Sequence, residues 1–265
     1  MTIALLFGAA GCRAEGDSSI VVATTTSVED SGLMDALVPA FEAAHPGTSV
    51  RTVAVGSGEA FALGRSKDAD ILITHSGWDE AQFVMQGYGA QSATIMYNHF
   101  VIVGPEADPA GVRQASGAPD ALKLIANAGA TFLTRGDSSG THAKELALWE
   151  EAQFAPHATA HPWYVESGVG MGDLLRVAGE RGAYTLTDRA TFLTVGTGSG
   201  LVVLLDDEDA VLYNPYAATV VSGNRHPQAA GAFYDWLRSV DGQNTIGAFG
   251  REQYQRSLFV PAVRP

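Results

Sequence analysis

The stretch Ile20-Val21-Val22-Ala23-Thr24-Thr25-Thr26-Ser27 decides the fold, because an apolar run passes directly into four hydroxyl residues. The apolar run predicts a buried strand, and the hydroxyl residues predict the start of a helix, where Ser and Thr favour the N-cap position. A second stretch has the same form, since Thr131-Phe132-Leu133-Thr134 is followed by Arg135-Gly136-Asp137-Ser138-Ser139-Gly140-Thr141-His142. Backbone N–H groups and hydroxyls gather at such turns, so each turn predicts a place that attracts an anion.

Strands and helices alternate outward from the first stretch. A β-α-β-α-β-α pattern over residues 20–87 predicts a parallel sheet with helices on its faces. Ligands of such sheets bind at the carboxyl ends of the strands. Pro39 predicts a kink or a second start inside the first helix. The predicted strands are 20–23, 49–55, 69–74, 94–103, 130–134, 183–186, 210–213 and 217–221, and the predicted helices are 31–44, 59–65, 79–86, 118–127, 141–152, 172–180, 228–239 and 241–249.

The composition narrows the class of protein. With 265 residues the chain is long enough for two α/β units with their own cores, and 46% hydrophobic against 17% charged residues indicates a folded chain. The net charge of −13 argues against nucleic acid as a partner, because phosphate binding needs a basic surface. The single cysteine, Cys12, excludes a disulfide framework and a cysteine metal cluster.

The N-terminus favours export. A short apolar run at residues 3–10 is followed by Gly11-Cys12, which is typical of a secretory signal with a lipoprotein cleavage site. Cys12 is then the lipidated first residue of the mature chain, and the small polar residues 13–19 form a tether. The alternative is an apolar N-terminal strand with a buried cysteine. No other stretch approaches the roughly 18 apolar residues of a transmembrane helix.

The two hydroxyl-rich turns suit a tetrahedral oxyanion such as phosphate, sulfate, molybdate or tungstate. Neutral O–H and N–H donors can surround such an ion without needing counter-charges of their own, and one arginine adds a bidentate anchor. The hydroxyl of Ser57, in Gly56-Ser57-Gly58, follows a third predicted strand. The candidate ligand-binding residues are Thr25, Thr26, Ser27, Ser57, Arg135, Ser139, Gly140 and Thr141.

Other interpretations of these residues stay open. Each Ser or Thr can be a helix cap that contributes about 1 kcal/mol, and Arg135 can pair with Asp137 or Glu145 at the surface. The tripeptide at 135–137 matches a cell-adhesion motif. The loop at 136–140 has the form of a serine-protease nucleophile loop, with Ser138 or Ser139 as nucleophile, but no companion base and acid are evident. The histidines lack metal-binding spacing, so no metal site is expected. No catalytic residue is expected, because the serine loop has no evident base and acid.

The chain is similar to the tungstate-binding proteins of tungstate ABC importers, a family of type II periplasmic-type binding proteins. The two hydroxyl-rich turns together are specific to that family. Further matching stretches are Gly56-Ser57-Gly58, Asp68-Ala69-Asp70 with His75, Met96-Tyr97-Asn98 with Phe100-Val101, Val103-Gly104-Pro105, Asp108-Pro109-Ala110-Gly111, Trp163-Tyr164, Gly170-Met171, residues 183–189 and Arg225-His226-Pro227. His99 departs from the family, which often has an acidic residue at this position near a crossing between the lobes.

The resemblance implies a two-lobed α/β fold that closes on one oxyanion, each lobe a mixed, mainly parallel sheet flanked by helices. Residues 1–19 would be the signal and tether, 20–98 plus 188–265 the first lobe, and 99–187 the second. Residues 96–100 and 185–188 would be the two crossings. The resemblance implies that Thr26, Ser27 and Ser57 bind from the first lobe, and Arg135, Ser139, Gly140 and Thr141 from the second.

The expected function is therefore that of an exported, lipid-anchored, monomeric solute-binding protein. It would capture tungstate, or molybdate, for an ABC permease, with no cofactor and no catalysis, in the periplasm or at the cell surface. The alternatives are a binding protein for molybdate, sulfate or phosphate, with Asp137 as acceptor for a phosphate proton, a serine hydrolase, and a sensory domain of a regulator. The apparent export signal argues against the sensory domain.

Overall fold

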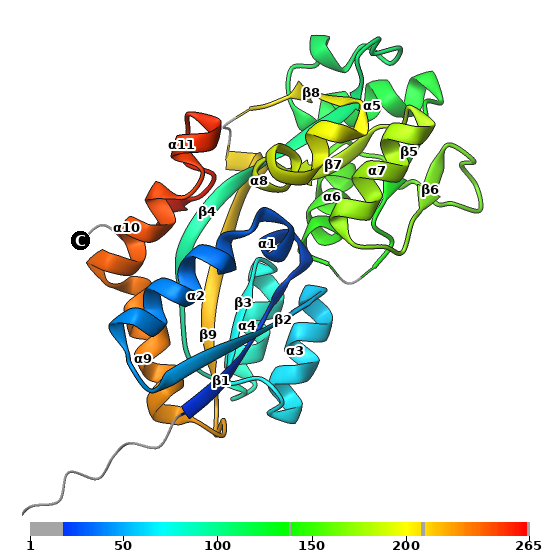
Figure 1. Ribbon diagram of the computed structural model, residues 1–265. Coiled ribbons are helices and arrows are strands. Elements are labelled where there is room, and N and C mark those ends of the chain that lie inside the picture. The colour runs from blue at the N-terminus through cyan, green and yellow to red at the C-terminus, as the bar shows by residue number, and fades with distance from the viewer. Residues whose placement is uncertain (1–17, 138, 208–209, 264–265) are drawn as a thin grey trace, which may run out of the picture.

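The predicted first strand lies inside a mixed sheet. The structure is a computed structural model, and it describes residues 18–137, 139–207 and 210–263. β1 (Ser18–Thr25) lies between β2 (Thr48–Val55) and β3 (Ile71–Thr74) and is parallel to both. β9 (Tyr213–Val221) and β4 (Gly89–Pro105) extend the sheet in antiparallel pairs, which gives the order β10-β4-β9-β3-β1-β2 (Figure 1). The predicted lipidation site, Cys12, lies outside the described residues.

Helices cover this sheet and a second body of the protein. The remaining strands are β5 (Phe132–Thr134), β6 (Tyr164–Glu166), β7 (Thr185–Asp188), β8 (Leu201–Leu205) and β10 (Val260–Pro261). The helices are α1 (Thr26–Ser31), α2 (Leu33–Ala44), α3 (Ser57–Ser66), α4 (Gly77–Met85), α5 (Ala118–Ala128), α6 (Gly140–Glu151), α7 (Met171–Arg181), α8 (Arg189–Thr191), α9 (Pro227–Arg238), α10 (Val240–Ala248) and α11 (Arg251–Tyr254). Single turns of 3₁₀ or π-helix are η1 (Val112–Gln114), η2 (Phe192–Gly196), η3 (Thr197–Ser199) and η4 (Ala210–Leu212).

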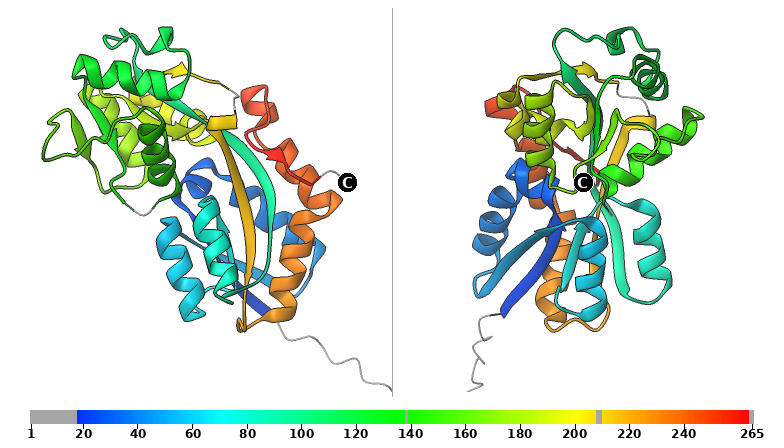
Figure 2. Two further views of the ribbon diagram at one scale, coloured as in Figure 1. Left: turned by 180° about the vertical axis from the view of Figure 1, so that it is seen from behind. Right: turned by 90° about the vertical axis from the view of Figure 1, so that its right-hand side faces the viewer.

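One long strand belongs to both bodies. The first part of β4 pairs with β9 and β10, whereas residues 100–105 pair antiparallel with β7 and β8. β5 and β6 form a separate parallel pair. We call the body around β1, β2, β3 and β9 the first lobe, and the body around β5 to β8 the second lobe; Figures 1 and 2 show β4 running from one to the other.

Each lobe has its own apolar core. In the first lobe, Leu33, Leu37 and Phe41 recur at helical spacing along α2, and all three are fully buried. Phe41 packs edge-on against Phe233 of α9, with 4.8 Å between ring centroids. The core of the second lobe contains Phe132, Leu122 and Trp149. Two separate cores mean that each lobe can move as a unit.

The predicted elements are found with corrections at three places, and the short elements β6, β10, α8 and α11 were not predicted. The predicted helix 31–44 is broken at Gly32, whose φ of 77° ends α1, and α2 continues through Pro39. The predicted strand at 210–213 is a 3₁₀ turn, and Tyr213 begins a strand that reaches Val221. Residues 201–205 form β8, which sequence patterning missed because Gly196-Thr197-Gly198-Ser199-Gly200 precedes them and reads as loop.

The predicted return to the first lobe at residue 188 does not match the packing. Ala190 packs in the core of the first lobe, but Phe192, Leu201 and Leu204 pack with the second. The final return comes between Leu212, in the core of the second lobe, and Tyr216, in the core of the first. The reason is that β8 pairs with the end of β4 that already belongs to the second lobe.

Candidate functional site

Parallel register brings the four predicted donors of the first lobe to one edge of the sheet. Thr25 is opposite Val55 in the β1–β2 pair, and Thr24 is opposite Ile73 in the β1–β3 pair. Thr26 and Ser57 therefore begin α1 and α3 at neighbouring strand ends. Thr25 and Ser27 are buried, with 3.1 Å between their hydroxyl oxygens, and Thr26 is half-buried. The residue at the end of β3 is His75, which patterning did not propose as a site residue.

The second lobe presents its predicted donors at the end of β5. Arg135 follows Thr134 directly and is only 4% exposed. Ser139 is the N-cap of α6, and its Oγ accepts the N–H of His142 at 3.2 Å. Gly140 and Thr141 form the first turn of that helix, where the backbone N–H groups have no partner within the helix. Ser138 lies outside the described residues.

Two buried polar atoms, one from each lobe, point to a missing partner. Ser57 is fully buried and its Oγ makes no hydrogen bond to any residue that the structure describes. Arg135 Nε is likewise buried and finds no acceptor among residues 18–137, 139–207 and 210–263. An unmade hydrogen bond of this kind costs about 1–3 kcal/mol, and more for a charged group. Each atom is therefore a donor that is free to bind an acceptor oxygen.

The lobes touch around these donors. A Cβ built on Gly140 would lie 2.7 Å from the carbonyl oxygen of His75, so only glycine lets α6 come this near. A Cβ on Gly170, the residue before α7, would lie 3.9 Å from Thr26. The backbone N–H of Gly172 donates to Asp30 Oδ2 at 3.0 Å. The N-terminus of α7 therefore meets α1, and the N-terminus of α6 meets His75 after β3, at the contact between the lobes.

Arg135 is the principal charge of the site. Its Nη2 donates to Asp137 Oδ2 at 2.5 Å, which realises one of the pairings that the sequence left open. Burial alone would raise the pKa of Asp137, but hydrogen bonds from Ser139 and the charge of Arg135 hold it below its usual range. The Arg135 charge also acts on Asp30 and His75 of the first lobe. Arg135 is thus positioned at the interface and is only partly neutralised.

A buried carboxylate anchors the loop that carries Arg135. Glu145, the other partner considered for Arg135, accepts instead from Thr134 Oγ1 at 2.5 Å, from Trp149 Nε1 at 3.0 Å and from Tyr164 Oη at 2.7 Å. His142 Nδ1 lies 2.9 Å from Thr134 Oγ1, and hydrogen bonding and charge from Glu145 raise the pKa of its imidazole. These contacts fix the end of β5 against α6, and they thereby fix the position of Arg135, which follows β5 directly.

Three residues at the contact between the lobes were not predicted as site residues. His75 and Gly170 lie in stretches that match the family but were given no role there, and Asp30 was not singled out. The glycines of Ser167-Gly168-Val169-Gly170-Met171-Gly172, directly before and at the start of a helix, were a usable signal of close backbone approach. The network of the site is therefore wider than the eight predicted residues.

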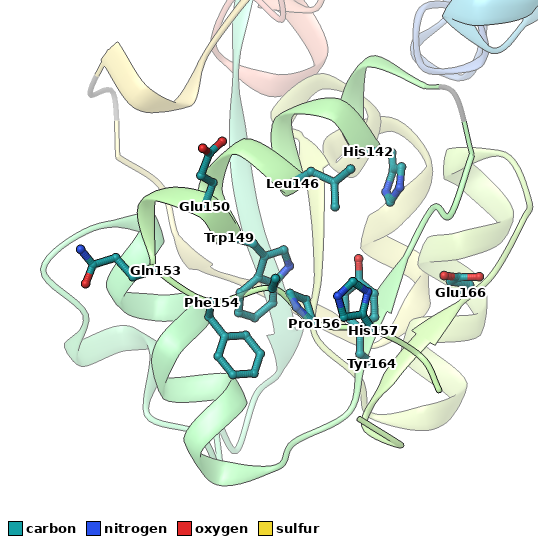
Figure 3. Close-up of a pocket in the computed structure, with 11 residues that line it drawn as sticks. His142, Leu146, Trp149, Glu150, Gln153, Phe154, Pro156, His157, Tyr164 and Glu166 are labelled. Carbon is teal, nitrogen blue, oxygen red and sulfur yellow. The ribbon is translucent and has the colours of Figure 1, made fainter. Parts of the chain in front are cut away.

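A cavity in the second lobe lies apart from the donors. It encloses about 460 Å³, and none of the eight predicted residues lines it. Figure 3 shows the rings of Trp149, Phe154 and Tyr164 along it, with Glu150 and Glu166 at opposite ends. Among the described residues no group of three or more His, Cys, Asp or Glu is arranged to hold a metal ion. No helix in the described part of the chain is both long and apolar enough to span a membrane.

Comparison with known proteins places these features in a family. A model of the PBP superfamily domain matches residues 13–241. The tungstate-binding protein TupA of Peptoclostridium acidaminophilum is 40% identical over 255 residues, which cover 94% of this chain and 87% of that protein. The chain belongs to the TupA family. The predicted family resemblance is therefore confirmed, and TupA proteins are solute-binding proteins by fold and name.

Solved structures of the TupA family share the architecture. A protein described as the tungstate ABC transporter from Geobacter sulfurreducens superposes with a TM-score of 0.79 at 41% identity, over 88% of this chain and 99% of that one. TupA from Desulfovibrio alaskensis G20 gives a TM-score of 0.75 at 39% identity, over 93% and 100%. These similarities confirm the predicted periplasmic binding protein fold.

Proposed function

We propose that the protein is an extracytoplasmic solute-binding protein that captures one tetrahedral oxyanion for an ABC importer. Tungstate is the preferred ion, and molybdate is the second candidate. The observation that carries the proposal is the pair of buried atoms without partners, Ser57 Oγ and Arg135 Nε, one from each lobe. The names of the relatives support tungstate as the ion. The remaining predicted donors, Thr25, Thr26, Ser27, Ser139, Gly140 and Thr141, stay proposals as ligands.

The proposed mechanism is closure of the lobes. Only when the lobes meet can the helix N-termini of α1 and α3 and those of α6 and α7 donate to the same ion. The ion selects the closed state because it has more donors there than in an open state. The importer then recognises the closed form. No bond is made or broken, and no cofactor takes part.

The arrangement of Ser139 argues against a hydrolase. Its Oγ accepts a backbone N–H as a helix cap, and the imidazole of His142 faces Thr134 and Glu145 instead. A nucleophilic serine would need its own hydrogen bond to a base. The protein is accordingly proposed to have no catalytic activity.

The N-terminal signal completes the proposal. Export with a lipid on Cys12 would hold a monomeric receptor beside its permease, with residues 13–19 as the tether. Mass spectrometry of the membrane fraction tests this part, because a diacylated Cys12 at the mature N-terminus is expected. A mature chain that still begins at residue 1 would contradict it.

Asp137 bears on the choice between ions. One carboxylate oxygen of Asp137 pairs with Arg135, and the other accepts the Ser139 N–H at 3.0 Å. Each oxygen already accepts one hydrogen bond, so Asp137 would accept the proton of a phosphate only through its remaining lone pairs. Tungstate and molybdate carry no proton near neutral pH and need none. Sulfate is the remaining competitor, and it is smaller.

Thermal unfolding with tungstate, molybdate, sulfate and phosphate in turn tests the function. A ligand at a hundred times its Kd adds about 2.7 kcal/mol of stability, or roughly 5–10 °C in a chain of this size. We expect the largest shift with tungstate. A shift with sulfate or phosphate alone would identify that anion as the ligand in place of tungstate. If no anion shifts the melting temperature and a fluorophosphonate labels a serine, the protein would be a hydrolase.

A further inference from the structure

A chain of buried polar side chains runs beneath the donors, from the first turn of α1 along the crossing strands to His75 after β3, where the first lobe meets the second. Its members are Thr191, Asp188, Asn98, Asn214 and His75, all of them 8% exposed or less. They come from α8, β7, β4, β9 and the end of β3. β4, β7 and β9 are the strands along which the polypeptide passes between the lobes. The chain therefore crosses the hinge.

One end of the chain holds the first turn of α1. Thr191 Oγ1 lies 3.1 Å from the carbonyl oxygen of Ser27 and 2.6 Å from Asp188 Oδ2, and these two acceptors share its single proton. Asp188 Oδ1 accepts the backbone N–H of Thr191 at 3.0 Å and Asn98 Nδ2 at 2.8 Å. Asp188 thus ties the donor helix of the first lobe to the first crossing strand, β4.

From His75 through Asn214 and Asn98, each side chain donates a hydrogen bond to the next one toward Asp188. Asn214 Nδ2 donates to Asn98 Oδ1 at 2.7 Å, and also to Tyr216 Oη at 3.0 Å. His75 Nδ1 lies 2.8 Å from Asn214 Oδ1, so this ring nitrogen carries the proton and donates. Each amide is fully oriented by its neighbours, and the series ends on a carboxylate. Such a series is cooperative, since each bond polarises the next.

The other end of the chain holds the first turn of α6. Gly140 is packed so closely on His75 that an added Cβ would lie 2.7 Å from its carbonyl oxygen and 3.0 Å from its ring atoms Cε1 and Nδ1. The ring of His75 is stacked on Tyr216 with 4.8 Å between centroids and is fixed at Nδ1 by Asn214. A shift of His75 must therefore shift the N–H groups that α6 presents.

We infer that the chain Thr191–Asp188–Asn98–Asn214–His75 is a coupler that positions the N-terminus of α6 relative to that of α1. Its members are positioning residues, and Gly140 is the contact through which the coupler reaches the second lobe. The inference rests on the proposed function for its purpose, because those two helix ends are the proposed donors. A buried polar network is weak evidence for stability, since an apolar core would serve as well; its use here is to fix geometry.

Hydrogen exchange of the ligand-free protein tests the coupler without any anion. Thr191→Val removes the hydroxyl, Thr191→Ser keeps it, and Thr219→Val is the matched control, because Thr219 is a buried threonine of β9 that bonds to Ser92. We expect Thr191→Val to speed exchange about fivefold in residues 26–31 and also in residues 139–143. Thr191→Ser and Thr219→Val should leave both segments as in the wild type. Acceleration of residues 26–31 alone would overturn the inference.

The reciprocal variant tests the same coupler from the second lobe. Gly140→Ala should speed exchange in residues 26–31, whereas Gly117→Ala should not, because Gly117 is the N-cap of α5 and has open space around it. Reciprocity is required of any real coupling. If Gly140→Ala leaves residues 26–31 unchanged, the coupler is absent even where Thr191→Val fails to fold.

A cycle of tungstate affinities then links the coupler to the function. Thr191→Val and Gly140→Ala should each weaken binding, and the double variant should lose less than the product of the two losses, as coupled residues do. Multiplicative losses would overturn the inference while leaving the function intact. Absence of tungstate binding in the wild type would overturn the function, and the exchange experiments would still decide the coupler.

Discussion

Gly172 of α7 donates its backbone N–H to the carboxylate of Asp30 in α1, so a hydrogen bond joins the two lobes beside the proposed donors. Burial raises the pKa of Asp30, against the effects of the Gly172 N–H and the Arg135 charge. The positive end of the α7 dipole stabilises the partly buried Asp30 carboxylate, and it does so only when the lobes are closed.

Asp30→Ala should therefore weaken tungstate binding by a factor of about 5, the equivalent of ~1 kcal/mol for one charge-assisted hydrogen bond. Calorimetric titration measures it. Asp35→Ala is the control, because Asp35 is an exposed carboxylate nearby in the first turn of α2. Equal affinities of the two variants would show that the Asp30 bond does not contribute to closure.

Arg135→Ala should cost at least ~2 kcal/mol of binding free energy, since a buried charge-assisted pair to the anion is lost. Arg135→Lys should recover part of the loss, because it restores the charge without the planar fork. Arg176→Ala removes an exposed arginine of α7 and serves as control. Unchanged tungstate affinity in Arg135→Ala would remove this residue from the site.

Ser57→Ala tests whether Ser57 binds the anion or only stabilises the fold. Because Ser57 Oγ has no protein partner among the described residues, its removal should leave the free energy of unfolding without ligand unchanged or slightly higher. Tungstate affinity should fall about 5-fold to 10-fold.

Ser31→Ala is the counterpart of Ser57→Ala. Ser31 is as deeply buried, but its Oγ donates to the carbonyl of Val28 at 2.6 Å. Its loss should destabilise the protein by about 1 kcal/mol and leave affinity nearly as it was. Chemical denaturation together with calorimetry checks both. A Ser57→Ala variant that loses stability but keeps its affinity would assign Ser57 a structural role.

Glu80 should make stability depend on pH. Burial raises the pKa of this carboxyl to about 7, although Thr74 Oγ1 and the Ser76 N–H donate to it. Between the ordinary pKa of 4.5 and 7, the unfolded chain has released this proton and the folded chain keeps it, so stability falls as pH rises through this window.

Glu80→Gln removes that titration. Relative to the wild type, the variant should gain stability between pH 4.5 and 7, by up to ~3 kcal/mol at about 1.4 kcal/mol per pKa unit, and the gain should be constant above pH 7. Urea denaturation at several pH values measures it. Glu59→Gln, at an exposed carboxylate in the first turn of α3, is the matched control. A parallel pH profile of wild type and Glu80→Gln would contradict the assignment.

The sequence predicts the local elements and where the proposed donors lie in them, because both depend on short-range patterns. Thr25, Ser57 and Arg135 each follow an apolar run at a position that only a strand-to-helix turn produces. The contact of His75 with Gly140 and that of Asp30 with Gly172 are different. They join residues 65 and 142 positions apart through the arrangement of the lobes, which no local pattern encodes. The pairing of Asn98 with Asp188 escaped for the same reason, and the departure noted at His99 is next to it.

The donor set has a kinetic consequence. Apart from Arg135, whose charge Asp137 partly offsets, the proposed donors are neutral hydroxyl and N–H groups on a protein with a net charge of −13. The net charge therefore repels an approaching dianion over roughly one Debye length, about 8 Å at physiological ionic strength, and the dianion is attracted only at contact with the donors. Added salt should consequently speed the association of the anion, the reverse of what a lysine-rich receptor would show.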